Sequence, residues 1–141
     1  AHPATEARFG RIPRFKVRIL RDKVLESAIR VMEMVKQSTN SKAILEVEYF
    51  NEKGTGLGPT LEFYTLVSHA VQRQNLKLWL STATTKAQGA IENNEDAFEH
   101  AFNPNGLFPA PMRTRDEKVI SMFEFLGSFV AKAVLDGRLL D

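Results

Sequence analysis

Two short stretches of the chain alternate between apolar and polar residues, which is the period of a half-buried β-strand. The first covers residues 15–20 (FKVRIL) and the second covers residues 43–50 (AILEVEYF). In the second stretch, one face carries Leu45, Val47 and Tyr49, and the opposite face carries two glutamates. The pattern therefore predicts two short strands that each turn one face toward a hydrophobic core.

Three longer stretches place apolar residues at helical spacing. The first follows Asp22, a good N-cap residue, and ends at the polar sequence QSTNS in residues 37–41. The second begins at Pro59, which suits the first helical position because its missing N–H is not needed there. The third begins at Thr114 and Glu117, which have the spacing of a capping box. Strands and helices in this order predict an α+β fold that is mainly helical with short strands.

Length and composition are those of one soluble globular domain. The chain has 141 residues, of which 43% are hydrophobic and 26% are charged. The longest apolar region begins at Val119, but Glu124 and Lys132 interrupt it, and it is shorter than the ~20 apolar residues of a membrane-spanning helix. We expect no membrane association. Because the N-terminus lacks an apolar signal segment, we expect a location in the cytoplasm, the nucleus or both.

The residue content excludes several kinds of chemistry. The sequence has no cysteine, so it offers no disulfide, no cysteine-ligated zinc site and no thiol nucleophile. Its three histidines, His2, His69 and His100, lack metal-ligand spacing. A nucleophile-elbow motif of the G-x-S-x-G type does not occur. We therefore predict no catalytic residue, no metal site and no cofactor within this chain.

Basic residues are concentrated near the N-terminus. Residues 8–23 (RFGRIPRFKVRILRDK) carry seven basic side chains against one acid. Lysine and arginine protect exposed strand edges from pairing with other chains, and a solvated strand edge is the favoured interpretation. Clustered Lys and Arg also bind phosphate backbones, so the alternative is a free-standing module that binds acidic partners or nucleic acid through this segment. In either case, residues 1–13 are predicted to form a basic N-terminal tail.

A glycine-rich turn joins the second predicted strand to the second predicted helix. A phosphate loop of the Walker type needs a lysine and then a serine or threonine after its last glycine, where this chain has Pro59 and Thr60. The dinucleotide fingerprint needs glycines at the first, third and sixth positions, whereas these lie at the first, third and fifth. Glu52 and Glu62 would also repel an anion. We therefore predict an architectural turn whose glycines provide positive φ angles and close backbone approach.

The same region resembles a known family. Residues 45–68 (LEVEYFNEKGTGLGPTLEFYTLVS) resemble the strand, glycine turn and helix near the start of the HECT domain of E3 ubiquitin ligases. Gly56 stands where the family usually has an aspartate, and Pro59 stands where it has a second glycine. In this form, the turn resembles the ubiquitin-fusion-degradation subgroup, which includes the thyroid-receptor-interacting member. The motif positions are Glu52, Gly54, Gly56, Gly58, Pro59, Glu62 and Phe63.

Four further segments resemble the same subgroup, in the order that the family has them. Three of them are VRILRDKVLESAIRVM, NLKLW and NGLFPAP, and the fourth, FEFLGSFVAKAVLDGRLLD, resembles a helix followed by an exit strand. The resemblance covers residues 14–141 and is weakest at residues 81–103, which we predict to be a variable loop. It implies that residues 14–141 are the start of a HECT N-lobe, within its large subdomain.

The resemblance also implies a function for the parent protein. HECT ligases accept ubiquitin from a conjugating enzyme (E2) onto a cysteine of their C-terminal lobe, and they pass it from this thioester to a substrate lysine. The present chain has no cysteine. We therefore expect a scaffold fragment that is inactive alone and that has ubiquitin, E2 and the rest of the HECT domain as partners in the full protein.

The last predicted helix has a wider apolar face than one partner helix should cover. In a whole HECT domain, later parts of the N-lobe would be expected to share this face. In the isolated chain we predict that the face is exposed and that the chain self-associates through it. The residues concerned are Phe123, Leu126, Phe129 and Val130.

Overall fold

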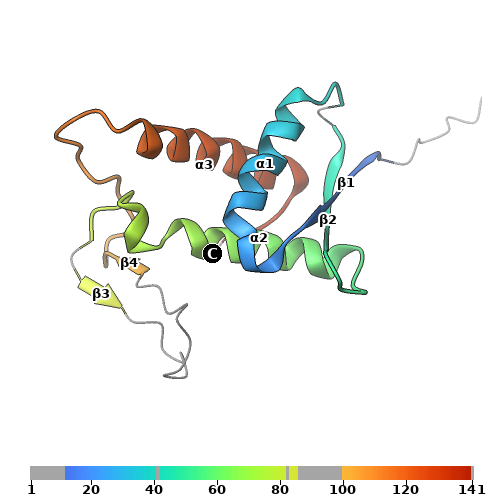
Figure 1. Cartoon of the computed structure of the whole chain (residues 1–141), viewed down its shortest axis with the longest axis horizontal. Coiled ribbons are helices and arrows are strands. Elements are labelled where there is room, and N and C mark those ends of the chain that lie inside the picture. The colour runs from blue at the N-terminus through green and yellow to red at the C-terminus, as the bar shows by residue number, and fades with distance from the viewer. Residues whose placement is uncertain (1–11, 41, 82, 86–99, 141) are drawn as a thin grey trace, which may run out of the picture.

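The computed structural model describes residues 12–40, 42–81, 83–85 and 100–140 (Figure 1). Helices predominate and the strands are short, which confirms the predicted α+β class. The strands are β1 (Arg14–Ile19), β2 (Ile44–Tyr49), β3 (Ala83–Thr85) and β4 (His100–Phe102). The α-helices are α1 (Val24–Gln37), α2 (Leu57–Val71) and α3 (Glu117–Asp136), and single 3₁₀ turns are η1 (Arg21–Lys23) and η2 (Gln74–Leu76).

The first two strands form a parallel pair. Their register runs from Arg14 opposite Ile44 to Ile19 opposite Tyr49. Parallel neighbours need a crossover connection, and α1 provides it. The alternation predicted for β1 is confirmed, because Val17 and Ile19 are buried and the basic residues are exposed. In β2 the apolar odd-numbered residues are buried as predicted, but Glu46 of the opposite face is buried as well.

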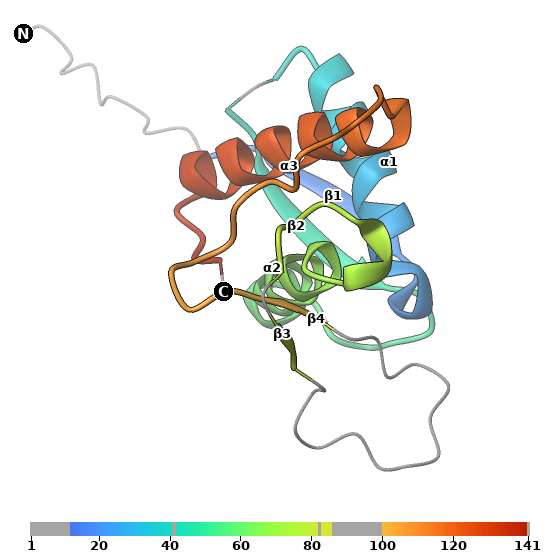
Figure 2. The same ribbon diagram turned by 90° about the vertical axis from the view of Figure 1, so that its left-hand side faces the viewer.

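The core lies where the three α-helices meet the inner face of this sheet. Figure 1 shows the β1–β2 sheet at one end of α2 and the β3–β4 pair at the other, and Figure 2 shows α3 crossing α2. Aromatic rings fill the contact between these two helices: Tyr64 stacks on Phe129 with ring centroids 5.3 Å apart, and Phe63 meets Phe129 edge-on. All three side chains are fully buried. The helix α1 adds small and medium apolar residues to the same cluster.

Two of the predicted helix starts are wrong by a few residues. Asp22 lies in the 3₁₀ turn, and α1 begins at Val24 without a hydrogen bond from a capping side chain. The helix α2 begins at Leu57, so Pro59 occupies its third position and not its first. Proline is tolerated there for the predicted reason, since the N–H groups of the first turn have no partner within the helix.

The third predicted helix start is also wrong. The N-cap of α3 is Asp116, whose side chain accepts hydrogen bonds from the backbone N–H groups of Lys118 (2.9 Å) and Val119 (3.3 Å). Thr114, the predicted cap, lies two residues earlier. An aspartate caps well because its carboxylate both accepts these bonds and faces the positive end of the helix dipole.

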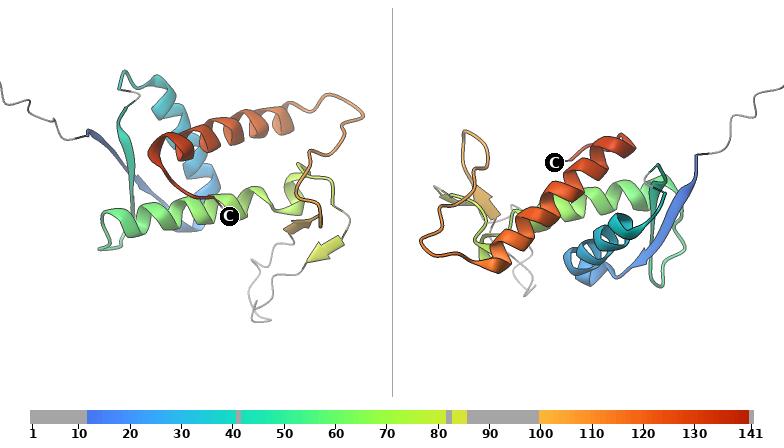
Figure 3. Two further views of the ribbon diagram at one scale, coloured as in Figure 1. Left: turned by 180° about the vertical axis from the view of Figure 1, so that it is seen from behind. Right: turned by 90° about the horizontal axis from the view of Figure 1, so that it is seen from above.

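The two ends of the chain segment 81–103 lie side by side, because β3 and β4 pair antiparallel with Ala83 opposite Phe102. Residues 86–99, the middle of the predicted variable loop, lie outside the described residues, as do residues 1–11 of the predicted tail. Residues 138–140 are not in a strand, so the exit strand implied by the resemblance is absent there. Instead they turn back toward α2, and Leu140 packs against the core (Figure 3). No helix in the described ranges is both long and apolar enough to cross a membrane.

The capping correction is testable. We expect Asp116→Ala to lower the free energy of unfolding by about 1 kcal/mol, because two N–H groups of α3 lose their acceptor. Thr114→Ala, the matched control, should change it by less than about 0.5 kcal/mol, as a surface substitution does. Urea unfolding followed by circular dichroism measures both. A larger loss in Thr114→Ala than in Asp116→Ala would restore the capping box.

Candidate functional site

The glycine turn is built around one residue with a positive φ angle. Gly56 has φ 85° and ψ −140° and is the N-cap residue of α2. Gly54 has no positive φ, but a Cβ atom there would lie 3.2 Å from Cγ of Pro59. Gly58 shows neither feature. The predicted architectural role is therefore divided: Gly56 provides the left-handed backbone and Gly54 the close approach.

Thr60 ties this turn to the sheet. Its hydroxyl donates a hydrogen bond to the carbonyl oxygen of Gly56 (2.8 Å) and accepts one from the backbone N–H of Val47 (3.0 Å). The side chain is fully buried. A hydroxyl is suited to this place because the same oxygen can donate to one backbone group and accept from another.

The two motif glutamates hold an arginine. Arg21 donates through Nε to Oε1 of Glu52 (2.7 Å) and through Nη1 to Oε1 of Glu62 (2.6 Å). A second bond to each carboxylate, from Nη2, makes both contacts bidentate. The guanidinium also lies 4.0 Å over the ring of Tyr49. We call these four residues the Arg21 clamp.

The clamp explains the charges around the turn. Hydrogen bonds from Arg21 lower the pKa of both Glu52 and Glu62 below their ordinary value of 4.5. The same bonds, first to Glu52 and then to Glu62, raise the pKa of Arg21. Burial raises the pKa of the Tyr49 hydroxyl to about 12. The carboxylates predicted to repel an anion are therefore bound to a cation that joins η1 to the start of α2.

Other basic residues of the N-terminal segment are paired across the sheet. Arg14 bonds Glu46 at 2.8 Å, Lys16 approaches the same carboxylate at 3.7 Å, and Arg18 bonds Glu48 at 3.1 Å. The hydrogen bond from Arg14 lowers the pKa of Glu46. The favoured interpretation of this segment, a solvated strand edge, is therefore incomplete, because these cations face solvent and also pair with glutamates of β2.

A buried ion pair anchors the end of α3. Nζ of Lys132 donates to Oδ1 of Asp136 (2.9 Å) and to the carbonyl oxygen of Ala43 (2.7 Å). Oδ2 of Asp136 accepts from the backbone N–H of Leu45 at 3.0 Å. The two charged side chains are only 6% and 3% exposed. Sequence reasoning missed this pair, although a lysine and an aspartate four residues apart on an apolar helix were a signal.

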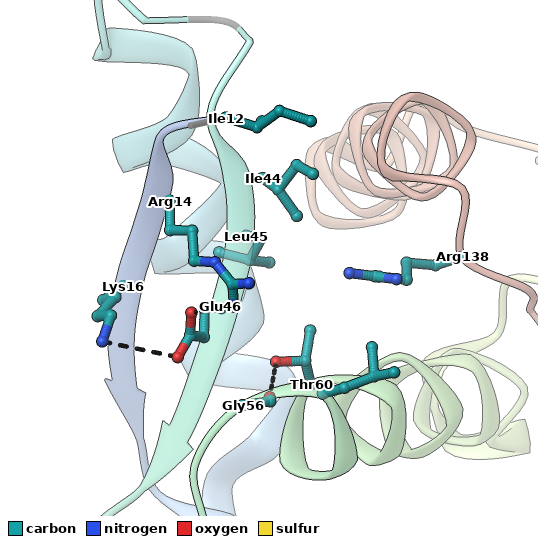
Figure 4. Close-up of a pocket in the computed structure, with 10 residues that line it drawn as sticks. Ile12, Arg14, Lys16, Ile44, Leu45, Glu46, Gly56, Thr60 and Arg138 are labelled. Atoms are coloured by element: carbon teal, nitrogen blue, oxygen red, sulfur yellow. Dashed lines mark hydrogen bonds and ion pairs between the residues drawn. The ribbon is translucent and has the colours of Figure 1, made fainter. Parts of the chain in front are cut away.

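A pocket of about 810 Å³ opens between β2, the start of α2 and the segment after α3 (Figure 4). Apolar side chains line it from two sides, among them Ile44 and Leu57. Three cations, Arg14, Lys16 and Arg138, and the carboxylate of Glu46 are its charged groups. Sequence reasoning did not identify this pocket, because its walls come from four separate segments.

The predicted apolar face of α3 is corrected by the structure. Phe129 is fully buried in the core, and Phe123 is half-buried against Trp79, with ring centroids 5.5 Å apart. Leu126 is also half-buried. Only Val130 of the predicted set is exposed, at 40%. The exposed apolar residues at this end of the chain are Val130, Val134, Leu135 and Leu139.

Comparison with known proteins relates nearly all of the chain to ubiquitin ligases. E3 ubiquitin-protein ligase UPL3 of Arabidopsis thaliana is 47% identical over 96% of this chain and 8% of its own length. E3 ubiquitin-protein ligase TRIP12 of Danio rerio is 41% identical over 93% of this chain and 6% of its own length. Ubiquitin fusion degradation protein 4 of Saccharomyces cerevisiae is 37% identical over 94% of this chain and 9% of its own length. The chain belongs to the HECT family of E3 ubiquitin ligases, in its ubiquitin-fusion-degradation subgroup.

This HECT-family chain spans less than a tenth of the length of these three relatives. No family model matches it. In the described part of the chain, no three acidic or histidine side chains are grouped so that they could hold a metal ion. The described arrangement holds chain segments together and presents a charged pocket.

The Arg21 clamp gives a pH-dependent prediction. We expect Arg21→Met to lower the free energy of unfolding at neutral pH by about 1 kcal/mol, a small value because the Arg21 side chain is 42% exposed. Lowered carboxylate pKa values stabilise the fold above the unfolded value of 4.5 and cease to do so as the pH falls through the folded values. The difference between wild type and variant should therefore shrink below pH 4.5.

Urea titrations from neutral pH downward, through the range in which both carboxylates become protonated, measure this difference. Arg30→Met, at an exposed arginine of α1, is the control and should show no such dependence. A difference in the free energy of unfolding between wild type and Arg21→Met that stays constant across this pH range would contradict the clamp.

Proposed function

We propose that residues 14–141 are the opening scaffold of a HECT N-lobe in a larger E3 ubiquitin ligase. In that ligase a cysteine outside this region receives ubiquitin from an E2 as a thioester and passes it to a substrate lysine. The observation that carries the proposal is the match of 96% of a cysteine-free chain to ligases of this family. The part left to these residues is structural support.

The contacts between distant segments support a scaffolding role. The Arg21 clamp joins η1 to α2, with a separation of 41 residues between Arg21 and Glu62. The bond from Leu45 to Asp136 joins β2 to the end of α3, 91 residues later in the chain. Such long-range polar contacts fix the positions of α2 and α3 relative to one sheet.

Partners and location follow from this proposal. Ubiquitin, an E2 and the remainder of the HECT domain are the partners of the full ligase, which acts in the cytoplasm, the nucleus or both. The alternative, a free-standing module that binds nucleic acid or acidic partners through residues 8–23, is not favoured. Arg14, Arg18 and Arg21 are paired with glutamates of the chain, so each would have to exchange a carboxylate for a phosphate.

Thioester formation tests the proposed division of roles. Given activating enzyme, charged E2 and ubiquitin, the 141-residue chain should form no adduct that dithiothreitol removes, because no residue can hold a thioester. The full-length ligase should form one. Gel electrophoresis with and without dithiothreitol measures both. A reducible band on the 141-residue chain, or none on the full-length ligase, would contradict the proposal.

We also predict that the isolated chain self-associates. The surface concerned is the apolar face at the end of α3 that the structure leaves exposed. Burial of apolar area contributes roughly 25 cal/mol per Å², so a few hundred Å² of shared surface contributes several kcal/mol that oppose the entropic cost of association. Val134 and Leu135 are 74% and 73% exposed. We expect Val134→Glu or Leu135→Glu to shift the chain toward the monomer.

Light scattering coupled to size exclusion, over a range of concentrations, measures the shift. Met34→Glu is the matched control, because Met34 is an exposed apolar residue of α1, and it should leave the association unchanged. A wild-type chain that stays monomeric at every concentration would refute this prediction without affecting the thioester test.

A further inference from the structure

Arg138 has a buried donor without an acceptor. Its Nε atom is inaccessible to solvent and makes no hydrogen bond within the described part of the chain. A buried polar group that lacks a partner costs free energy, and the cost is larger for a charged group. Figure 4 shows the guanidinium pointing from the segment after α3 into the pocket, toward Leu45 and Glu46.

The backbone holds this side chain in place. Gly137 ends α3 with φ 67°, and the N–H groups of Gly137 and Arg138 donate to the carbonyl oxygens of Val134 (3.2 Å) and Ala133 (2.8 Å). This is the hydrogen-bond pattern of a Schellman motif, which fixes the direction in which the chain leaves the helix. Arg138 is therefore directed into the pocket by a defined turn.

The charges of the pocket do not balance. Glu46 is its single carboxylate among the lining residues, and Arg14 and Lys16 already pair with it. Arg138 adds a third cation, so the lining carries three positive charges against one negative. Since the pKa of Glu46 is lowered by Arg14, this carboxylate stays ionised at neutral pH and the pocket keeps a net positive charge.

The apolar part of the lining restricts the class of ligand. Leu57 is 55% exposed and Ile12 is 62% exposed, and both lie at the pocket together with the half-buried Ile44. These side chains offer a surface for an apolar group beside the cations. An inorganic anion or a phosphate backbone would leave that surface uncovered, whereas a peptide would cover it.

The outer edge of β2 is closed to strand addition at this place. The N–H groups of Leu45 and Val47 already donate to Asp136 and Thr60. A peptide that paired as a third strand would have to displace both acceptors. A ligand of this pocket must therefore be recognised through its side chains.

We propose that this pocket binds an aspartate or glutamate side chain of a polypeptide segment, with a neighbouring large apolar residue of that segment against Ile44 and Leu57. The carboxylate faces the end of the Arg138 guanidinium, which points into the pocket from the segment after α3. A guanidinium offers its donors in a fork that matches a carboxylate, which gives the contact direction as well as charge.

The test uses the ¹⁵N-labelled 141-residue chain and three peptides with blocked ends. The first has the sequence Ala-Leu-Asp-Leu-Ala, the second replaces its aspartate with asparagine, and the third replaces both leucines with serine. The first should shift the Arg138 Nε–H resonance in a saturable way. The other two should each bind at least tenfold more weakly, about the effect of one charge-assisted hydrogen bond or one buried apolar side chain.

Two matched pairs of variants locate the contact. Arg138→Gln should weaken binding of the first peptide at least tenfold. Arg30→Gln, at an exposed arginine of α1 that does not line the pocket, should leave this binding unchanged. Leu57→Asn should also weaken binding of the first peptide, whereas Leu61→Asn, at another exposed leucine of α2, should not. Amide dispersion in the same spectra shows that each variant is folded.

Three outcomes would overturn the proposal. The first is binding of the aspartate and asparagine peptides with equal affinity. The second is peptide binding that Arg138→Gln leaves unchanged. The third is an equal shift of the Arg138 resonance by sodium acetate or inorganic phosphate at the concentration of the peptide, which would indicate a general anion site.

Discussion

The outer edge of β2 is the constraint on which the rest of the structure depends. One edge of this strand pairs with β1, but the N–H groups of Leu45 and Val47 lie on the other edge, inside the molecule. Buried backbone groups need partners, and no third strand supplies them in the described part of the chain. Asp136 and Thr60 do so instead, so side chains of α3 and α2 take the place of a strand.

This arrangement requires a charge inside the core, and Lys132 neutralises it. An unpaired carboxylate at the position of Asp136 would be strongly disfavoured, since removing one partner of a buried pair costs about 3 to 5 kcal/mol. Because Lys132 also donates to the carbonyl oxygen of Ala43, both charged groups bind the same strand. The pair therefore determines where the end of α3 lies, and with it the position of Arg138.

Charge pairing has a different role on the surface. Four cations of β1 and η1, Arg14, Lys16, Arg18 and Arg21, meet the glutamates of β2, the glycine turn and α2, so these described basic residues are paired within the fold. Surface pairs of this kind contribute little stability each, but the Arg21 clamp combines two bidentate contacts with a ring contact. It connects η1 to the glycine turn and to α2.

Local patterns in the sequence determined the three α-helices and the first two strands of this protein, whereas β3 and β4 lie in the stretch predicted to be a loop. The period of two in residues 43–50 and the helical period from Pro59 predicted β2 and α2, because burial of one face follows from the geometry of a single strand or helix. The motif around Gly56 also identified the family. Helix starts were less predictable: Asp116 caps α3 although Thr114 and Glu117 have the better-known spacing.

Only the tertiary structure decided which charges meet. Arg21 and Glu62, or Leu45 and Asp136, are brought together by the packing of separate elements, and no spacing in the sequence records such a contact. The same holds for burial around α3: its apolar residues were evident, but Phe129 lies in the core and Val134 in solvent because α2 covers one side of the helix. Periodicity defines an apolar face, whereas the neighbouring elements determine how much of that face is covered.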